Sequence, residues 1–125
     1  MSHVSAVNPL AGKTLTVSTG VLPDLTDNTK ETIHTCTDSG KLVAVIFGLA
    51  ENSANISITS AVDIDGTETA GTHTSGVEDD ETIIYNYYEV RTYPLTPFNT
   101  DIVCYLTVDY SFDMLVTFAT VIYYK

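Results

Sequence analysis

Apolar and polar residues alternate along much of this sequence, and the alternation limits the fold more than any other feature. Successive residues of a β-strand face opposite sides, so such a pattern predicts strands with one buried face. In the segment 56–64, the apolar residues with this spacing are Ile56, Ile58, Val62 and Ile64. Threonine, which suits strands better than helices, occurs 20 times. The sequence therefore predicts an all-β protein.

The alternating segments are separated by residues typical of turns, and they define seven or eight expected strands. The predicted strands cover residues 15–19, 32–37, 41–50, 56–64, 67–73, 82–93, 102–109 and 114–124. Asp65 and Gly66 are expected to form a two-residue hairpin turn, because both central positions of that turn need a positive φ. Residues 21–30 and 74–80 are expected to be loops. The connection 94–99 contains two prolines, which exclude a central strand there.

Strands at this spacing, with no predicted helix, favour a single antiparallel two-sheet sandwich. Its connectivity is expected to be either jelly-roll or immunoglobulin-like. With 125 residues we expect one domain over 1–125, in which residues 1–12 form an extended N-terminal arm. The strands 41–50, 102–109 and 114–124 are strongly apolar, so they are expected at central positions of their sheets.

The two cysteines, Cys36 and Cys104, both fall in predicted strands. Their separation would suit the disulfide that joins the sheets of an immunoglobulin domain. That family also expects a core Trp and a Tyr two residues before the second Cys. This sequence has no Trp, and position 102 is Ile. We therefore expect two free thiols that behave as small buried hydrophobic residues.

The chain carries 16 acidic and 5 basic side chains, which gives a formal net charge of −11. This excess argues against nucleic acid and anionic membranes as partners, because both select clustered Lys and Arg. Proteins that stay soluble at high salt have surfaces of this composition, and so do ordinary acidic proteins, so both interpretations stay open. The N-terminal residues show no basic patch followed by an apolar stretch, and we expect synthesis in a reducing cytosol.

No group of residues predicts catalysis. The histidines His3, His34 and His73 are not accompanied by a nucleophile motif or by an acid that would orient them. His34 and Cys36 could share one strand face, but no second pair of zinc ligands lies close in the sequence. We therefore expect a non-enzymatic protein with no catalytic residues and no cofactor.

Four aspartates are candidate calcium ligands. Asp63 and Asp65 begin a pattern that resembles a calcium-binding loop, and Asp79 and Asp80 belong to an acidic run. The hairpin turn explains Asp65 without a metal, and a solvated loop explains the acidic run. We predict no metal site and keep calcium at these four residues as the alternative.

Aromatic residues gather in the predicted strands 82–93 and 114–124. Tyrosine is enriched at protein interfaces because it buries a large area and keeps a hydroxyl group, although a tyrosine-rich core would account for the same residues. The last strand is apolar on both faces, so one face needs a cover from a second surface. The expected interface residues are Tyr85, Tyr87, Tyr88, Tyr93, Phe118, Ile122, Tyr123 and Tyr124.

Taken whole, the sequence resembles small structural proteins of tailed viruses, namely capsid decoration, head-fibre and turret proteins. The resemblance rests on the Thr-rich all-β pattern and on two segments, Pro94-Leu95-Thr96-Pro97-Phe98-Asn99 and Ala119-Thr120-Val121-Ile122-Tyr123-Tyr124-Lys125. It implies a jelly-roll or immunoglobulin-like domain without catalytic residues, which binds a capsid lattice as a homotrimer or another multimer. It also implies a place in the virion, after assembly in the host cytoplasm.

A second function stays open, that of a carbohydrate-binding or adhesin module that uses tyrosine rings and calcium. Exposed aromatic residues beside acids would favour sugar binding, whereas an apolar seam along a strand would favour assembly. The sequence favours the seam. The predicted function is therefore a non-enzymatic virion protein that decorates, stiffens or projects from a capsid, with itself and another virion protein as partners.

Overall fold

The computed structural model describes residues 12–23, 25–51, 57–80, 84–109 and 116–125, and it describes the side chains in these ranges except at 50, 51, 75–80 and 84–87. These ranges contain nine strands and no helix. The strands are β1 (Leu15–Pro23), β2 (Glu31–Thr37), β3 (Gly40–Glu51), β4 (Ser57–Ile64), β5 (Thr67–Glu68), β6 (Thr72–Asp80), β7 (Ile84–Phe98), β8 (Asp101–Asp109) and β9 (Val116–Tyr124).

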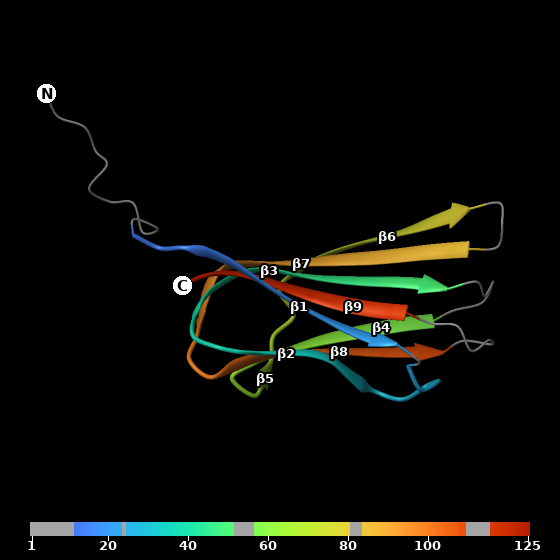
Figure 1. Ribbon diagram of the computed structural model, residues 1–125, viewed down its shortest axis with the longest axis horizontal. Coiled ribbons are helices and arrows are strands. Elements are labelled where there is room, and N and C mark those ends of the chain that lie inside the picture. The colour runs from blue at the N-terminus through green and yellow to red at the C-terminus, as the bar shows by residue number, and fades with distance from the viewer. Residues whose placement is uncertain (1–11, 24, 52–56, 81–83, 110–115) are drawn as a thin grey trace, which may run out of the picture.

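The strands form two antiparallel sheets that face each other (Figure 1). One sheet has five strands in the order β1-β9-β3-β7-β6, and the other has four in the order β2-β8-β4-β5. The pairing is nested, because β1 pairs with β9, β2 with β8, β3 with β7 and β4 with β5. Successive pairs lie in alternate sheets, which is the connectivity of a jelly roll, and β6 is added beside β7. The predicted all-β sandwich is confirmed, with the first of its two expected connectivities.

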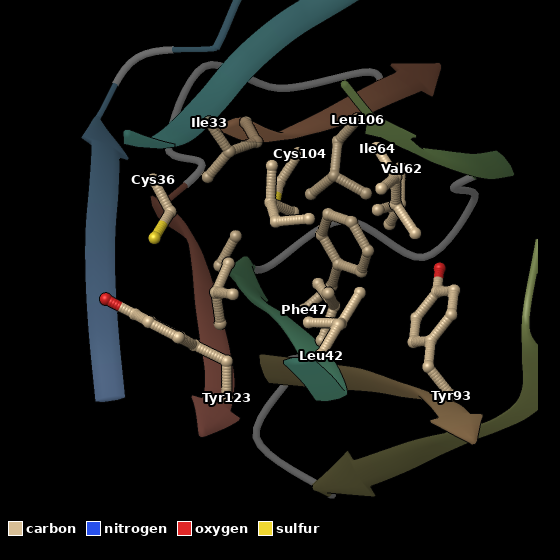
Figure 2. Close-up of a cluster of buried hydrophobic side chains, with 14 of the residues drawn as sticks. Ile33, Cys36, Leu42, Phe47, Val62, Ile64, Tyr93, Cys104, Leu106 and Tyr123 are labelled. Atoms are coloured by element: carbon tan, nitrogen blue, oxygen red, sulfur yellow. The ribbon is translucent and has the colours of Figure 1, made fainter. Parts of the chain in front are cut away.

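The core lies between the sheets, and strand alternation selects its residues. Every second residue of β8 is buried, from Ile102 to Val108. Figure 2 shows Phe47 of β3 projecting toward Leu106 of the opposite sheet, and both side chains are fully buried. The strands β3, β8 and β9 each pair on both sides, which confirms their predicted central positions.

Both cysteines are part of this core. Cys36 of β2 and Cys104 of β8 are buried and carry free thiols, as predicted. Burial, with a smaller contribution from the neighbouring Cys36, raises the pKa of Cys104 to about 12. The Cys104 thiol therefore stays protonated at neutral pH and packs as a small apolar group.

The prediction that residues 94–99 lie outside strands is wrong, because β7 continues through both prolines. β6 pairs with β7 only as far as Thr92, so Pro94 and Pro97 lie where β7 has a neighbour on one side only. A register shift against β3 lies at the same place, and Leu95 has a φ of 50°. Proline is tolerated at free edges and at bulges of this kind, because no ladder hydrogen bond is lost there.

The prediction of a loop at 74–80 is also wrong, because these residues belong to β6 and pair with β7. Their polar and acidic sequence has low strand propensity, which pairing with a long neighbouring strand overrides. The single strand expected at 67–73 is split into β5 and the start of β6, which gives nine strands. The first strand extends past its predicted range of 15–19 and ends at Pro23, so the loop predicted at 21–30 begins later.

Candidate functional site

The face of the five-stranded sheet that points away from the core, here called the outer sheet face, is the most apolar surface described. Six large hydrophobic residues are exposed in the described part of the chain, and all six lie on this face. They are Leu15, Val17, Val21, Tyr88, Val116 and Phe118. Soluble monomers rarely expose an apolar patch of this extent, so the outer sheet face is a candidate interaction surface.

Strand alternation explains why these residues are exposed. In β9, Thr117 and Ala119 are fully buried, whereas Val116 and Phe118 between them are 51% and 38% exposed. In β1 the exposed residues Val17 and Val21 recur at even spacing and are each 60% exposed. A strand with apolar residues on both faces needs a cover on each, and the core provides only one.

Phe118 lies near the middle of the outer sheet face. Its ring lies over Gly48 of the neighbouring strand β3, at the position where any larger residue would place its Cβ atom. In the same row across the sheet, Val21 pairs with Phe118 and Gly48 pairs with Tyr88. The missing side chain at Gly48 therefore lets the Phe118 ring lie close to the sheet between Val21 and Tyr88.

The next row of the outer sheet face is also uncharged. It runs from Thr19 to Thr120, Ile46 and Val90 on four adjacent strands. The two threonine hydroxyls form a hydrogen bond with each other at 2.9 Å, so each hydroxyl has a partner within this face. Lys41, at one end of β3, is the only charged residue among the described side chains of this face.

The acidic residues whose side chains are described lie elsewhere. Asp63, Asp101 and Asp109 are on the outward side of the four-stranded sheet, and Glu89 is inside the sandwich. The remaining acids with described side chains are in loops, in turns or on β2 and β5, and they are Asp27, Glu31, Asp38, Asp65 and Glu68. None of these nine carboxylates lies on the outer sheet face. Glu78 and Asp80 occupy register positions of the outer sheet face on the edge strand β6, where the side chains are not described. The other four strands of this face, β1, β9, β3 and β7, carry no described carboxylate, unlike the outward side of the four-stranded sheet.

Two of the predicted interface residues, Tyr93 and Tyr123, are not at the surface. They are 6% and 3% exposed, and Figure 2 shows them at opposite flanks of the core. The interface prediction is wrong for both, because strand alternation turns each ring inward. Tyr93 donates a hydrogen bond from its hydroxyl to the Thr69 carbonyl at 2.8 Å. Burial raises the pKa of Tyr93 to about 12.

The other predicted interface residues have different positions. Tyr88 and Phe118 are exposed on the outer sheet face, and Ile122 and Tyr124 are half-buried on the same side of β9. The remaining two are in β7, and their side chains lie outside the described residues: Tyr85 and Tyr87. Val17 and Val21 of β1 belong to the face and are not among the predicted interface residues. Val21 lies beyond the strand predicted at 15–19, whereas Val17 lies within it.

A buried ionic cluster ties the sheets together on the side of β7. The Glu89 side chain is 1% exposed, and its Oε1 atom accepts hydrogen bonds from Arg91 Nε at 2.6 Å and Ser60 Oγ at 2.5 Å. His73 Nε2 lies 3.2 Å from the same oxygen. Arg91 also donates to the carbonyl oxygens of Ala70 and Ser60. The sequence contains no local motif that predicts this cluster, because its members come from β4, β6, β7 and the segment before β6.

The candidate calcium ligand Asp65 has a structural role. Its φ of 50°, with 84° at Gly66, confirms the predicted hairpin turn. Its carboxylate accepts hydrogen bonds from the backbone N–H groups of Asn99, Thr100 and Asp101 at 2.8 to 3.2 Å. These donors, that of Thr100 first, lower the pKa of Asp65. A ring of N–H donors stabilises the anion and faces the oxygens that a cation would need.

The other candidate metal ligands do not form a site in the described chain. Asp63 is on β4, and Asp79 and Asp80 are in β6 with side chains outside the described residues. No group of three or more His, Cys, Asp or Glu side chains in the described ranges is arranged to hold a metal ion.

One serine and one histidine are in hydrogen-bond contact. Ser18 Oγ of β1 lies 2.7 Å from His34 Nε2 of β2, and burial lowers the pKa of His34. A Cβ atom at Gly20 would meet the His34 ring at 2.5 Å, so the ring fills the space between β1 and β2. Nucleophilic catalysis also needs a group that orients the histidine, and no such group contacts His34 in the described part of the chain. The Ser18–His34 hydrogen bond joins β1 to β2 at this side of the sandwich.

Asp38, in the turn between β2 and β3, joins that turn to the C-terminal strand. Its carboxylate accepts hydrogen bonds from the Tyr123 hydroxyl at 2.6 Å and from the Ser39 N–H at 2.8 Å. Lys125 Nζ lies 3.1 Å from the same group. These partners, Tyr123 foremost, lower the pKa of Asp38 to about 2, and burial together with the same contact raises the pKa of Tyr123.

Comparisons with protein-family models, with curated proteins and with solved structures found no match to this chain. Within the residues that the structure describes, no helix is long and apolar enough to cross a bilayer. The functional argument therefore rests on the surfaces of this chain, among which the outer sheet face is the most distinctive.

Proposed function

We propose that this protein is a non-enzymatic structural protein that acts by assembly, through the outer sheet face, in a virion. The observation that carries the proposal is the gathering of all six exposed large hydrophobic residues of the described chain on one sheet face. Apolar surface of this kind gains free energy when another protein surface covers it.

The fold is compatible with this role and does not decide it. Jelly rolls occur in viral capsid proteins and also in lectins, so the argument for function has to come from a site. The polar clusters in the described chain hold structural elements together. The Glu89 cluster joins β4 to β7, the Asp65 carboxylate holds the turn before β8, and Ser18 with His34 joins β1 to β2. The assembly role is favoured because the outer sheet face has no such internal purpose.

The carbohydrate-binding alternative has one feature in its favour. Tyr105, on the outward side of the four-stranded sheet, lies near Asp63 and Asp101, an aromatic ring beside acids. However, Lys30 Nζ lies over the Tyr105 ring at 4.4 Å from its centroid. A sugar would have to displace this ammonium group before it could stack on that side of the ring. Assembly is therefore the better-supported function.

The proposal is tested by fractionation of particles from the source culture. Particles would be banded in a density gradient, washed with nuclease and detergent, and searched for peptides of this chain by mass spectrometry. We expect the chain to band at particle density with the nucleic acid that the particles protect. Recovery of the chain only among soluble proteins would contradict the proposed function. Binding to immobilised glycans that Tyr105→Ala abolishes would favour the alternative instead.

A further inference from the structure

We propose that the outer sheet face is covered by the same face of a second copy of this chain, so that the protein is a twofold dimer. This inference rests on the proposed function, because it names the occupant of the surface through which the protein is proposed to assemble. Three properties of the face support it, namely its size, the absence of described carboxylates and the filled position above Gly48 at its centre.

The face is large enough for a stable interface. Five strands spaced about 4.8 Å apart, each about nine residues long at about 3.3 Å per residue, span an area of roughly 700 Å². Stable protein–protein interfaces bury about 600–1,000 Å² on each partner, so full coverage of this face by another sheet falls within that range. A small ligand would leave most of the six exposed residues in water.

The charge distribution favours this mode of contact between two copies. A chain with a net charge of −11 repels its own copies, and the repulsion is weakest where few acids lie in the contact. None of the nine described carboxylates lies on the outer sheet face, and the register positions of Glu78 and Asp80 are on its edge strand β6, at the rim of such a contact. Asp63, Asp101 and Asp109 lie on the opposite side of the sandwich. Contact of the outer sheet face with that opposite side would bury these three carboxylates without partners, which is costly.

Stacking two outer sheet faces instead keeps the acids far apart. Sheets pack about 10 Å apart, so a stack of four sheets places the two acidic surfaces about 30 Å from each other. The Debye length at physiological ionic strength is about 8 Å, and the repulsion between these surfaces is then largely screened. Sheet-on-sheet packing of this kind is a common way for two apolar sheet faces to meet.

The centre of the face is filled, and a contact between two such faces closes after two copies. The Phe118 ring occupies the space above Gly48, so no hollow is left at this position. A face that meets the same face of a second copy forms an isologous contact, which is complete in a dimer. The resemblance to virion proteins implies a homotrimer instead, so the assembled mass distinguishes the two arrangements.

The test is sedimentation equilibrium of the full chain from micromolar to millimolar concentration. We expect a species of twice the 13.6 kDa mass of one chain. Val17→Asp, at a position 60% exposed on the outer sheet face, is expected to weaken dimerisation by at least about tenfold. Thr59→Asp is the matched control, because it adds the same charge at an exposed strand position on the other side of the sandwich. Circular dichroism and melting temperatures would show that both variants fold.

Each result decides the inference. A dimer that Val17→Asp weakens and Thr59→Asp does not would support it. A monomer at millimolar concentration, a trimer, or a dimer that responds equally to both variants would overturn it. A monomeric chain that still bands with particles would overturn the dimer and leave the proposed function in place. A dimer that never bands with particles would overturn the proposed function and leave the dimer in place.

Discussion

The ring of Phe118 occupies the space above Gly48 that any other residue would fill with its Cβ atom. The two residues are direct neighbours on β9 and β3, at the centre of the outer sheet face. A single glycine in the strongly apolar central strand β3 thus affects the shape of the outer sheet face. Glycine within a strand often marks such a close approach.

Gly48→Ala is expected to weaken self-association about tenfold while the free energy of unfolding of the monomer changes by less than about 1 kcal/mol. The new methyl group displaces the Phe118 ring from the space above Gly48, which changes the shape of the outer sheet face at its centre. The better strand propensity of alanine offsets the cost of moving a partly exposed ring. Sedimentation gives the association constant, and urea unfolding at a concentration where the chain is monomeric gives the stability. An unchanged association constant would place Phe118 outside the interface.

The sandwich could be predicted from the sequence because burial on one face imposes a period of two. The strands at 32–37, 41–50, 56–64 and 102–109 were predicted within one residue of the observed limits wherever these lie in the described chain. The two wrong assignments, at 74–80 and 94–99, have a common reason. Both segments are poor strand formers by composition, and the neighbouring strands β7 and β3 provide the pairing that composition cannot reveal.

The surface could be predicted only in part. Alternation in the last strand placed Phe118 and Ile122 on one face and Tyr123 on the other, as observed. It could not tell which of the two faces the core would cover, so Tyr93 and Tyr123 were assigned to the interface. That choice depends on where the second sheet lies, which is a property of the whole fold.

Arg91→Met is expected to lower the free energy of unfolding by about 3–5 kcal/mol, because it leaves the buried Glu89 carboxylate without its main charge partner. Methionine retains the length and apolar stem of arginine, so the loss reports the missing charge. Glu89→Gln in the same chain should restore part of the stability, since the buried carboxylate charge that Arg91 balances is then also gone. Chemical unfolding of the two single variants and the double variant measures the coupling. Losses that simply add would contradict a direct interaction across the cluster.

Tyr123→Phe is expected to raise the pKa of Asp38 from about 2 toward the value of an unperturbed carboxyl, because the Tyr123 hydroxyl is its foremost hydrogen-bond donor. Since the folded pKa lies below that of the unfolded chain, about 3.9, the stabilisation by Asp38 is complete above about pH 4 and is lost as the pH falls toward 2. Carboxyl carbon chemical shifts in an NMR titration measure the pKa. Tyr93→Phe is the control, because that hydroxyl bonds the Thr69 carbonyl. An equal change in both variants would contradict the assignment.

Asp65→Asn is expected to destabilise the fold at neutral pH and to reduce the loss of stability on acidification. Asparagine tolerates the positive φ of this turn, so the substitution removes the carboxylate and retains the turn. The pKa of Asp65 is lowered by backbone N–H donors, so its contribution is present above the unfolded pKa of about 3.9 and disappears as the pH falls below it. Melting temperatures of wild type and variant between neutral pH and pH 2 measure the effect. Parallel curves for the two proteins would refute it.

The central claim is that a second copy of the chain covers the outer sheet face, and the fluorescence of a single introduced tryptophan tests it most directly. The chain contains no Trp, so Val17→Trp on the outer sheet face and Thr59→Trp on the opposite side each provide one probe. As the concentration rises through the dimerisation range, the emission of the Val17→Trp protein should shift to the blue, because the indole leaves water. The Thr59→Trp emission should stay constant. A constant Val17→Trp emission over the range in which the mass doubles would contradict the claim.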